Sequence, residues 1–239
     1  MHLDLSGNKV KNLTIFTNEE CFLNLKYLDI SDNKFNEFAA FKLPKLEYLD
    51  VSKNKLEKVN ADWKGHENIR ILKSVDNKFK TLQLFSNMPK LEQLYVAKNA
   101  IQTFTQLEGV PNLKRLHMRE NKIDKFPEEE EEMISLPALE YLNLRKNKLV
   151  DKKNLMFIFN EDKFPMLTDL NVYDCPVEKS YSSLNIFIGD VLIKNPKILR
   201  FCKVSITDQL RLEAVFLGQY KWEKEEAERK RLEEEERKR

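Results

Sequence analysis

The sequence predicts an α/β solenoid, in which stacked repeats each give one strand to a parallel β-sheet on the concave face, followed by a C-terminal cap and a charged helical tail. Three observations in the 239-residue chain predict it: an asparagine recurs at a nearly constant spacing, apolar residues keep fixed offsets from it, and the composition changes abruptly near the C-terminus. We expect the solenoid with its cap to span residues 1–205 and a helix to span 206–239, charged and exposed to solvent from about residue 221.

The repeat follows the pattern L-x-x-L-x-L-x-x-N-x-L in eight units, with spacings from 21 to 28 residues. Four apolar slots lie eight, five and three residues before the asparagine and two residues after it. Of the 31 slots inside the chain, 30 are apolar and Ser74 is the exception, whereas a composition of 41% hydrophobic residues gives about 13 by chance. The asparagine slot holds Asn8, Asn33, Asn54, Asn77, Asn99, Asn121, Asn147 and, in the eighth unit, Cys175.

Each part of the unit has a physical reason. The L-x-L stretch alternates like a strand, so every second side chain points inward. The asparagine amide can satisfy backbone groups of neighbouring turns, and stacked units would align these amides into a ladder. Proline precedes several strands, as in Leu43 to Leu46 and Leu136 to Leu139, where it needs no ladder hydrogen bond. We expect return segments of about ten residues, folded as compact helical or 3₁₀ turns.

The pattern resembles the leucine-rich repeat superfamily, in the short class of about 22 residues that is typical of intracellular proteins. The resemblance covers roughly residues 1–205. It implies a solenoid whose units are stable only when stacked, and by itself it says little about function.

The two ends of the predicted solenoid differ. The chain begins inside a strand, at Met1 to Leu5, and because solenoids usually need a polar cap we expect an upstream part or a partner to cover this end. At the other end, helical spacing of apolar residues within 180–194, followed by Asn195 to Phe201, resembles the cap of intracellular leucine-rich repeat proteins. The resemblance makes Tyr181 the leading tyrosine of that cap and puts Cys202 where the family has aspartate.

A last helix follows, with Ser205 or Thr207 as its expected N-cap. Lys221 to Arg239 contain eight basic and eight acidic residues, many of them paired four apart. Leu232 alone does not make a heptad seam, so this stretch predicts a single solvated helix rather than a coiled coil.

Composition excludes several classes of function. The net charge of +2 argues against a general nucleic-acid binder, and no apolar run is long enough to cross a membrane. The five glycines are scattered and form no phosphate loop, and the three histidines lack metal-site spacing. The three cysteines are far apart and odd in number, which fits a reducing compartment. We therefore expect a protein without catalysis, cofactor, metal or small-molecule substrate.

The candidate site is the concave face, where the solvent-facing residues lie six, four and two positions before each asparagine. The first three units are acidic there and the fourth to seventh are basic, and aromatic and arginine side chains are the usual anchors of protein interfaces. Tyrosine at this place also packs against its neighbours across the strands. Arg115, His117 and Arg119 lie side by side, and their mutual repulsion suggests an acidic partner. The candidate partner-binding residues are Tyr27, Asp29, Tyr48, Asp50, Lys73, Tyr95, Arg115, His117, Arg119, Tyr141, Arg145 and Tyr173.

A second charged feature is the acidic run Glu128 to Glu132, which follows Phe126-Pro127 in a predicted return loop. A solvated loop is the default interpretation. A docking patch for a basic partner is the alternative.

Three late features resemble the leucine-rich repeat-containing protein 23 family, whose members are components of ciliary radial spokes. These features are Leu139 to Asn147, then Asp174-Cys175-Pro176, then a cap followed by a tail rich in Glu, Arg and Lys. The resemblance implies a scaffold in a large assembly of the axoneme, located in the cytoplasm and the ciliary cytoskeleton. Three alternatives stay open: a regulatory subunit that binds a protein phosphatase, an axonemal dynein-associated light chain, and a spliceosomal protein with a small RNA-binding partner. The long charged tail favours a structural role over the phosphatase regulator.

Overall fold

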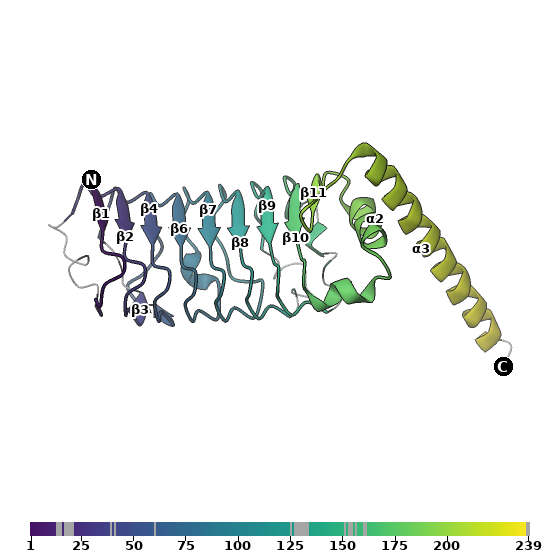
Figure 1. The fold of residues 1–239 in the computed structure, drawn as a ribbon, viewed down its shortest axis with the longest axis horizontal. Helices are drawn as coiled ribbons and strands as arrows, with labels where there is room; N and C mark the ends of the chain where they lie inside the picture. The colour runs from purple at the N-terminus through teal and green to yellow at the C-terminus, as the bar shows by residue number, and fades with distance from the viewer. Residues whose placement is uncertain are drawn as a thin grey trace.

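The computed structural model describes residues 1–12, 16, 22–38, 40, 42–59, 61–124, 126, 134–150, 152, 155, 157–159 and 162–237. A ten-stranded sheet runs through this part of the chain, in the order β1-β2-β4-β6-β7-β8-β9-β10-β11-β12, and every pairing is parallel except the last. Figure 1 shows these strands side by side in chain order. The fold predicted from the repeat is confirmed. The strands are β1 His2–Asp4, β2 Tyr27–Asp29, β4 Tyr48–Asp50, β6 Ile71–Lys73, β7 Gln93–Tyr95, β8 Arg115–His117, β9 Tyr141–Asn143, β10 Asp169–Asn171, β11 Arg200–Phe201 and β12 Val204–Ser205.

The asparagine slot forms the expected ladder between neighbouring units. The Asn121 amide donates to Val96 O of the preceding unit at 2.9 Å and to Met118 O of its own, while its oxygen accepts from Ile101 N at 3.1 Å. The same two contacts with the preceding unit recur at the asparagines from Asn33 to Asn147. At the eighth unit the Cys175 thiol donates to Leu144 O at 3.3 Å instead. These contacts satisfy backbone groups in the interior, which would be costly to leave unpaired.

The turn after each strand depends on the residue before the asparagine. In all eight units this residue has a positive φ, between 52° and 67°. Such angles favour glycine, yet only the first unit has one, at Gly7, and the others use Asp, Lys or Glu. The asparagine therefore holds the turn together, while its predecessor adopts the left-handed conformation that makes it possible. The eight residues are Gly7, Asp32, Lys53, Asp76, Lys98, Glu120, Lys146 and Asp174.

The return segments are more extended than the sequence suggests. Two of them form a small parallel sheet from β3 Glu37–Phe38 and β5 Lys58–Val59. Two others contain the 3₁₀ helices η2 Gln83–Phe85 and η4 Phe157–Phe159. The prediction of compact helical or 3₁₀ turns is therefore confirmed for only some of the described return segments. The acidic run at 128–132 lies outside the described residues.

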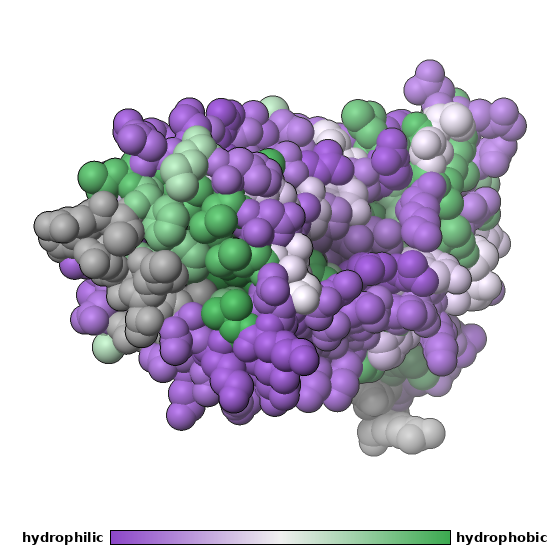
Figure 2. Space-filling model, turned by 60° about the vertical axis from the view of Figure 1, so that its left-hand side comes forward, coloured by the Kyte–Doolittle hydropathy of each residue, from purple (hydrophilic) through white to green (hydrophobic). Residues whose placement is uncertain are grey.

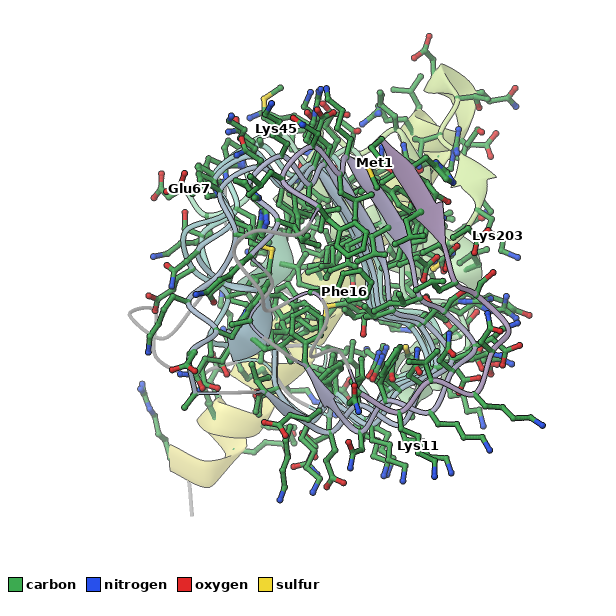
Figure 3. The ribbon with its side chains drawn as sticks, turned by 90° about the vertical axis from the view of Figure 1, so that its left-hand side faces the viewer. Met1, Lys11, Phe16, Lys45, Glu67 and Lys203 are labelled. Carbon is green, nitrogen blue, oxygen red and sulfur yellow. The ribbon has the colours of Figure 1, made fainter. Side chains whose placement is uncertain are left out.

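The core lies between the sheet and the return segments, and it is made mostly of Leu and Phe that are fully buried. Ser74, the polar exception in the apolar slots, is also fully buried, and its hydroxyl oxygen lies 3.3 Å from the Asn77 amide nitrogen. Figure 3, viewed along the stack from the β1 end, shows Lys203 on the sheet side and Glu67 on the opposite side, with the core between them. The exposed face of the sheet, hereafter the sheet face, thus consists of outward strand residues.

The C-terminal cap consists of η5 Pro176–Ser180, α2 Leu184–Lys194 and the first part of α3 Asp208–Arg237. Ser183 caps α2 by accepting a hydrogen bond from Ile186 N, and Thr207, not Ser205, caps α3 through Leu210 N. Tyr181 is buried and stacks on Phe187 at 4.1 Å. The helices cross closely because Gly189 and Gly218 lack side chains: a Cβ on Gly189 would lie 2.1 Å from Ala214 O.

Beyond α2, α3 extends away from the solenoid as one continuous helix, which confirms the helical tail (Figure 1). Its charged part contains ion pairs three and four residues apart, such as Lys230 with Glu226 at 3.0 Å. Among the described residues, no helix combines the length and apolarity that a membrane span requires.

The N-terminal end of the stack is the most apolar part of the surface in view. Figure 2 shows hydrophobic side chains gathered there. Met1, Val10 and Leu23 are exposed, and Leu3 and Leu5 are only partly buried, although their counterparts in later units are fully buried.

Candidate protein-binding face

The register of the sheet arranges the outward residues into rows. The first row runs through Tyr27, Tyr48, Ile71, Gln93, Arg115, Tyr141 and Asp169 to Arg200. The second runs through Asp29, Asp50, Lys73, Tyr95, His117, Asn143 and Asn171. A third row follows the strands and includes Arg119, Arg145 and Tyr173. All twelve predicted site residues therefore lie on one face of the solenoid.

Aromatic rings stack along the first row at the N-terminal end of the sheet. His2 stacks on Tyr27 at 3.7 Å between ring centroids, and Tyr27 stacks on Tyr48 at 4.1 Å. Burial raises the pKa of Tyr48 to about 12, with the nearby Asp50 and Asp29 adding to the effect. These tyrosines thus pack across the strands as well as facing outward, so both sequence interpretations of them apply.

A second stack occupies the middle of the sheet. Tyr95 stacks on His117 at 4.4 Å, and the His117 ring lies 4.7 Å from that of Tyr141. Burial, with the charges of Arg115 and Arg119, lowers the pKa of His117 to about 4. His117 is therefore neutral near pH 7, and β8 with its following turn carries two positive charges rather than three.

Lys73, Arg115 and Arg145 of the sheet face lie over aromatic rings. Lys73 Nζ lies 5.1 Å from the centroid of Tyr48, and the guanidinium carbon of Arg115 lies 4.7 Å from that of Tyr141. Arg145 lies 5.3 Å over Tyr173. Such contacts contribute about 0.5–1 kcal/mol at exposed sites and fix the direction of the side chains. Arg119 lies next to a carboxylate instead, with its Nη1 3.8 Å from Glu120 Oε1.

The aspartates of the second row have a local structural role that the sequence analysis missed. Asp29 and Asp50 accept hydrogen bonds from the backbone N–H two residues on, each at 2.9 Å. Asn143 and Asn171 occupy the same slot in later units and make the same contact. Asx side chains commonly bond to the backbone in this way, so an Asp or Asn four residues before the ladder asparagine was the available signal.

At the C-terminal end of the sheet face the chain forms an open hollow of about 400 Å³, hereafter the basic hollow. Among the described residues, its lining contains the cations Arg119, Arg145, Arg200 and Lys203 and one carboxylate, Asp169. Arg200 pairs with Asp169 at 3.3 Å. Its remaining lining residues are Tyr141, Asn143, Asn171 and Ser205.

Arg200 and Lys203 were not among the predicted site residues. Their signal is the register of the cap: Arg200 follows Ile198 by two positions, as Tyr48 follows Leu46, which places it in the first row. Among the described residues, no group of three or more His, Cys, Asp or Glu is arranged to hold a metal ion. The face offers rings, cations and amides, which suit recognition of another protein.

Comparisons with known proteins agree on the fold. The Leucine Rich Repeat family matches residues 24–42, and no curated protein matches the sequence significantly. The solved APL1 leucine-rich repeat domain is similar at 17% identity and a TM-score of 0.53, covering 84% of this chain and 48% of that one, so this chain spans about half its length. A chain of the Drosophila melanogaster SNF/U2A' complex is similar at 20% identity and a TM-score of 0.48, covering 57% of this chain and 76% of that one. With its repeat motif and its asparagine ladder, the chain has the fold of a leucine-rich repeat solenoid and is similar to proteins of that superfamily.

Proposed function

We propose that this protein is a non-catalytic scaffold of the ciliary axoneme, a structural component of the radial spoke that holds other proteins on its sheet face. The leucine-rich repeat fold supports the general part of this proposal, since such solenoids present extended binding surfaces. The observation that carries it is the ordered row of stacked rings and ring-bound cations across the sheet face. Rigid aromatic and arginine side chains are the residues that anchor protein interfaces.

The tail supports a structural role within a large assembly. The 30 residues of α3 reach about 45 Å at 1.5 Å per residue, and much of that length lies beyond its contact with α2. A projecting charged helix suits a protein that spans neighbouring subunits. The resemblance of the late repeat, the cap and the tail to the leucine-rich repeat-containing protein 23 family points to the radial spoke.

The proposal is tested by affinity purification of the tagged protein from motile ciliated cells, followed by mass spectrometry. Recovery of radial spoke subunits with the wild-type protein is the expected result. Recovery of a phosphatase catalytic subunit, a dynein heavy chain or a spliceosomal RNA-binding protein in their place would refute the radial spoke and favour the corresponding alternative.

The site is tested in the same cells with two variants. Charge reversal at Arg115 and Arg119 changes two cations of the sheet face, whereas charge reversal at Lys34 and Lys55 alters two exposed lysines outside the outward rows. We expect the first variant to lose the partners and the second to keep them. Equal recovery with both would show that the sheet face is not the binding surface.

A further inference from the structure

The two ends of the sheet face carry opposite charge, and they differ in how far that charge is already satisfied. At the β2–β4 end, Asp29 and Asp50 bond to backbone N–H groups, and Asp50 also lies 4.0 Å from Lys73 Nζ. These carboxylates are therefore partly neutralised within the chain. The cations at the other end have fewer counter-charges among the described residues.

The basic hollow gathers four cations around one carboxylate. Asp169 pairs with Arg200, and Glu120, at the rim, pairs with Arg119 at 3.8 Å. Arg145 and Lys203 make no salt bridge with the other described residues. Arg145 Nε is also inaccessible to solvent and has no hydrogen-bond acceptor in the described part of the chain.

The geometry of the hollow selects a ligand with several negative charges. Its cations come from three of four successive levels of the sheet, namely the turns after β8 and β9 and the cap strand β11 with its turn, while β10 between them contributes Asp169. Neighbouring strands lie about 4.8 Å apart, so these levels extend over roughly 10–15 Å. One carboxylate cannot reach all of them, whereas carboxylates on successive turns of a helix, about 5.4 Å apart, match the spacing.

We infer that the basic hollow binds an acidic segment of the partner protein, with at least two carboxylates seated among Arg119, Arg145, Arg200 and Lys203. This inference rests on the proposed protein-binding role of the sheet face and adds the chemistry of the partner and the end of the face that it occupies. Like charges held together on one surface gain from a complementary partner, which also fixes the register of that partner. The acidic β2–β4 end repels the same segment and directs it towards β8–β11.

The test uses a synthetic helical peptide of about 16 residues, long enough to cross the five levels from β7 to β11 at 1.5 Å per residue. One form carries glutamates along one face, a second has glutamines in their place, and a third has a single phosphoserine. Binding to the full chain is followed by nuclear magnetic resonance and by titration calorimetry at two salt concentrations. We expect the glutamate form to bind, to shift resonances of the four cations of the hollow, and to weaken with salt.

Two double variants locate the site. Arg200→Gln with Lys203→Gln removes two exposed cations of the hollow, and Lys34→Gln with Lys55→Gln removes the same charge from a distant surface. We expect at least about tenfold weaker binding for the first and no change for the second, because about 1.4 kcal/mol corresponds to tenfold. Circular dichroism confirms the fold of each.

Several results overturn the inference. It fails if the glutamine form binds as well as the glutamate form, if both double variants weaken binding equally, or if only the phosphoserine form binds. It also fails if native partners lost on charge reversal at Arg115 and Arg119 are retained by the Arg200 and Lys203 variant. In that last case the sheet face is still the binding surface, so the proposed function survives.

Discussion

Replacement of Asn121 by alanine tests how the solenoid is held together. Asn121 is only 7% exposed and makes three hydrogen bonds with backbone groups of two units, at 2.9, 2.9 and 3.1 Å. A typical hydrogen bond contributes about 1 kcal/mol net, and a buried partner left unpaired adds its own cost. We therefore expect Asn121→Ala to lower the free energy of unfolding by roughly 2–4 kcal/mol.

The first unit of the stack contains the matched control. Asn8 occupies the same motif slot, but it is exposed, and its amide donates to Leu5 O and Ser6 O of its own unit. We expect Asn8→Ala to cost less than about 1 kcal/mol, since water can replace these contacts.

Urea unfolding followed by circular dichroism measures both variants. The midpoint should fall strongly for Asn121→Ala with an unchanged slope, whereas a changed slope would report separate unfolding of the units. The ladder explanation would be refuted if Asn8→Ala were as destabilising as Asn121→Ala.

Three further predictions concern the pH response, the cap and the eighth unit. The pKa of His117 is lowered in the folded chain, so between pH 6.5 and 4 the unfolded chain binds more protons and stability falls as the pH falls. Because solvent screens this partly exposed group, we expect the free energy of unfolding, measured by urea unfolding, to fall by about 1–2 kcal/mol from pH 7 to pH 4. His117→Gln should remove this part of the pH dependence. Gly189→Ala should lower the free energy of unfolding by more than about 2 kcal/mol, because its Cβ would lie 2.1 Å from Ala214 O, and the melting temperature should fall accordingly. Gly218→Ala should lower it less, because its Cβ would lie 3.0 Å from the flexible end of Ile193 and 3.1 Å from the backbone of Gly189. Burial raises the pKa of Cys175 to about 11, so alkylation of its peptide at pH 8, read by mass spectrometry, should be slow in the native protein and fast in urea.

The fold was predictable because every unit of the chain has nearly the same residue types at its motif positions. One asparagine and four apolar slots recur with little variation, and each unit confirms the others, so a weak local signal becomes strong when summed along the chain. The return segments were less predictable because their residues vary from unit to unit. β3 and β5 pair as extended strands, whereas η2 forms a 3₁₀ turn in the equivalent region of another unit.

The sequence predicted which residues of the repeats lie on the sheet face, but not their charge states or ion pairs. Alternation placed Tyr48 and Arg115 on the sheet face, since a strand exposes every second residue. The charge of His117 depends on burial between two rings, and the pairing of Arg200 with Asp169 depends on how the cap joins the sheet. Burial and long-range pairing are properties of the assembled stack, and neither can be read from one unit.

The arrangement of cations and rings explains how one end of the sheet face can be strongly basic without a bound partner. Arg115 lies over Tyr141, and Arg145 lies over Tyr173, so each of these cations faces a ring rather than another cation. Cation–ring contacts of about 0.5–1 kcal/mol offset part of the mutual repulsion, which water and salt also reduce at an exposed face. A ring offers no hydrogen-bond acceptor as strong as a carboxylate, so the guanidinium groups keep donors for a partner. Tyr141 and Tyr173 thus position Arg115 and Arg145 without neutralising them, so Arg145 lines the basic hollow with its charge available to an acidic segment.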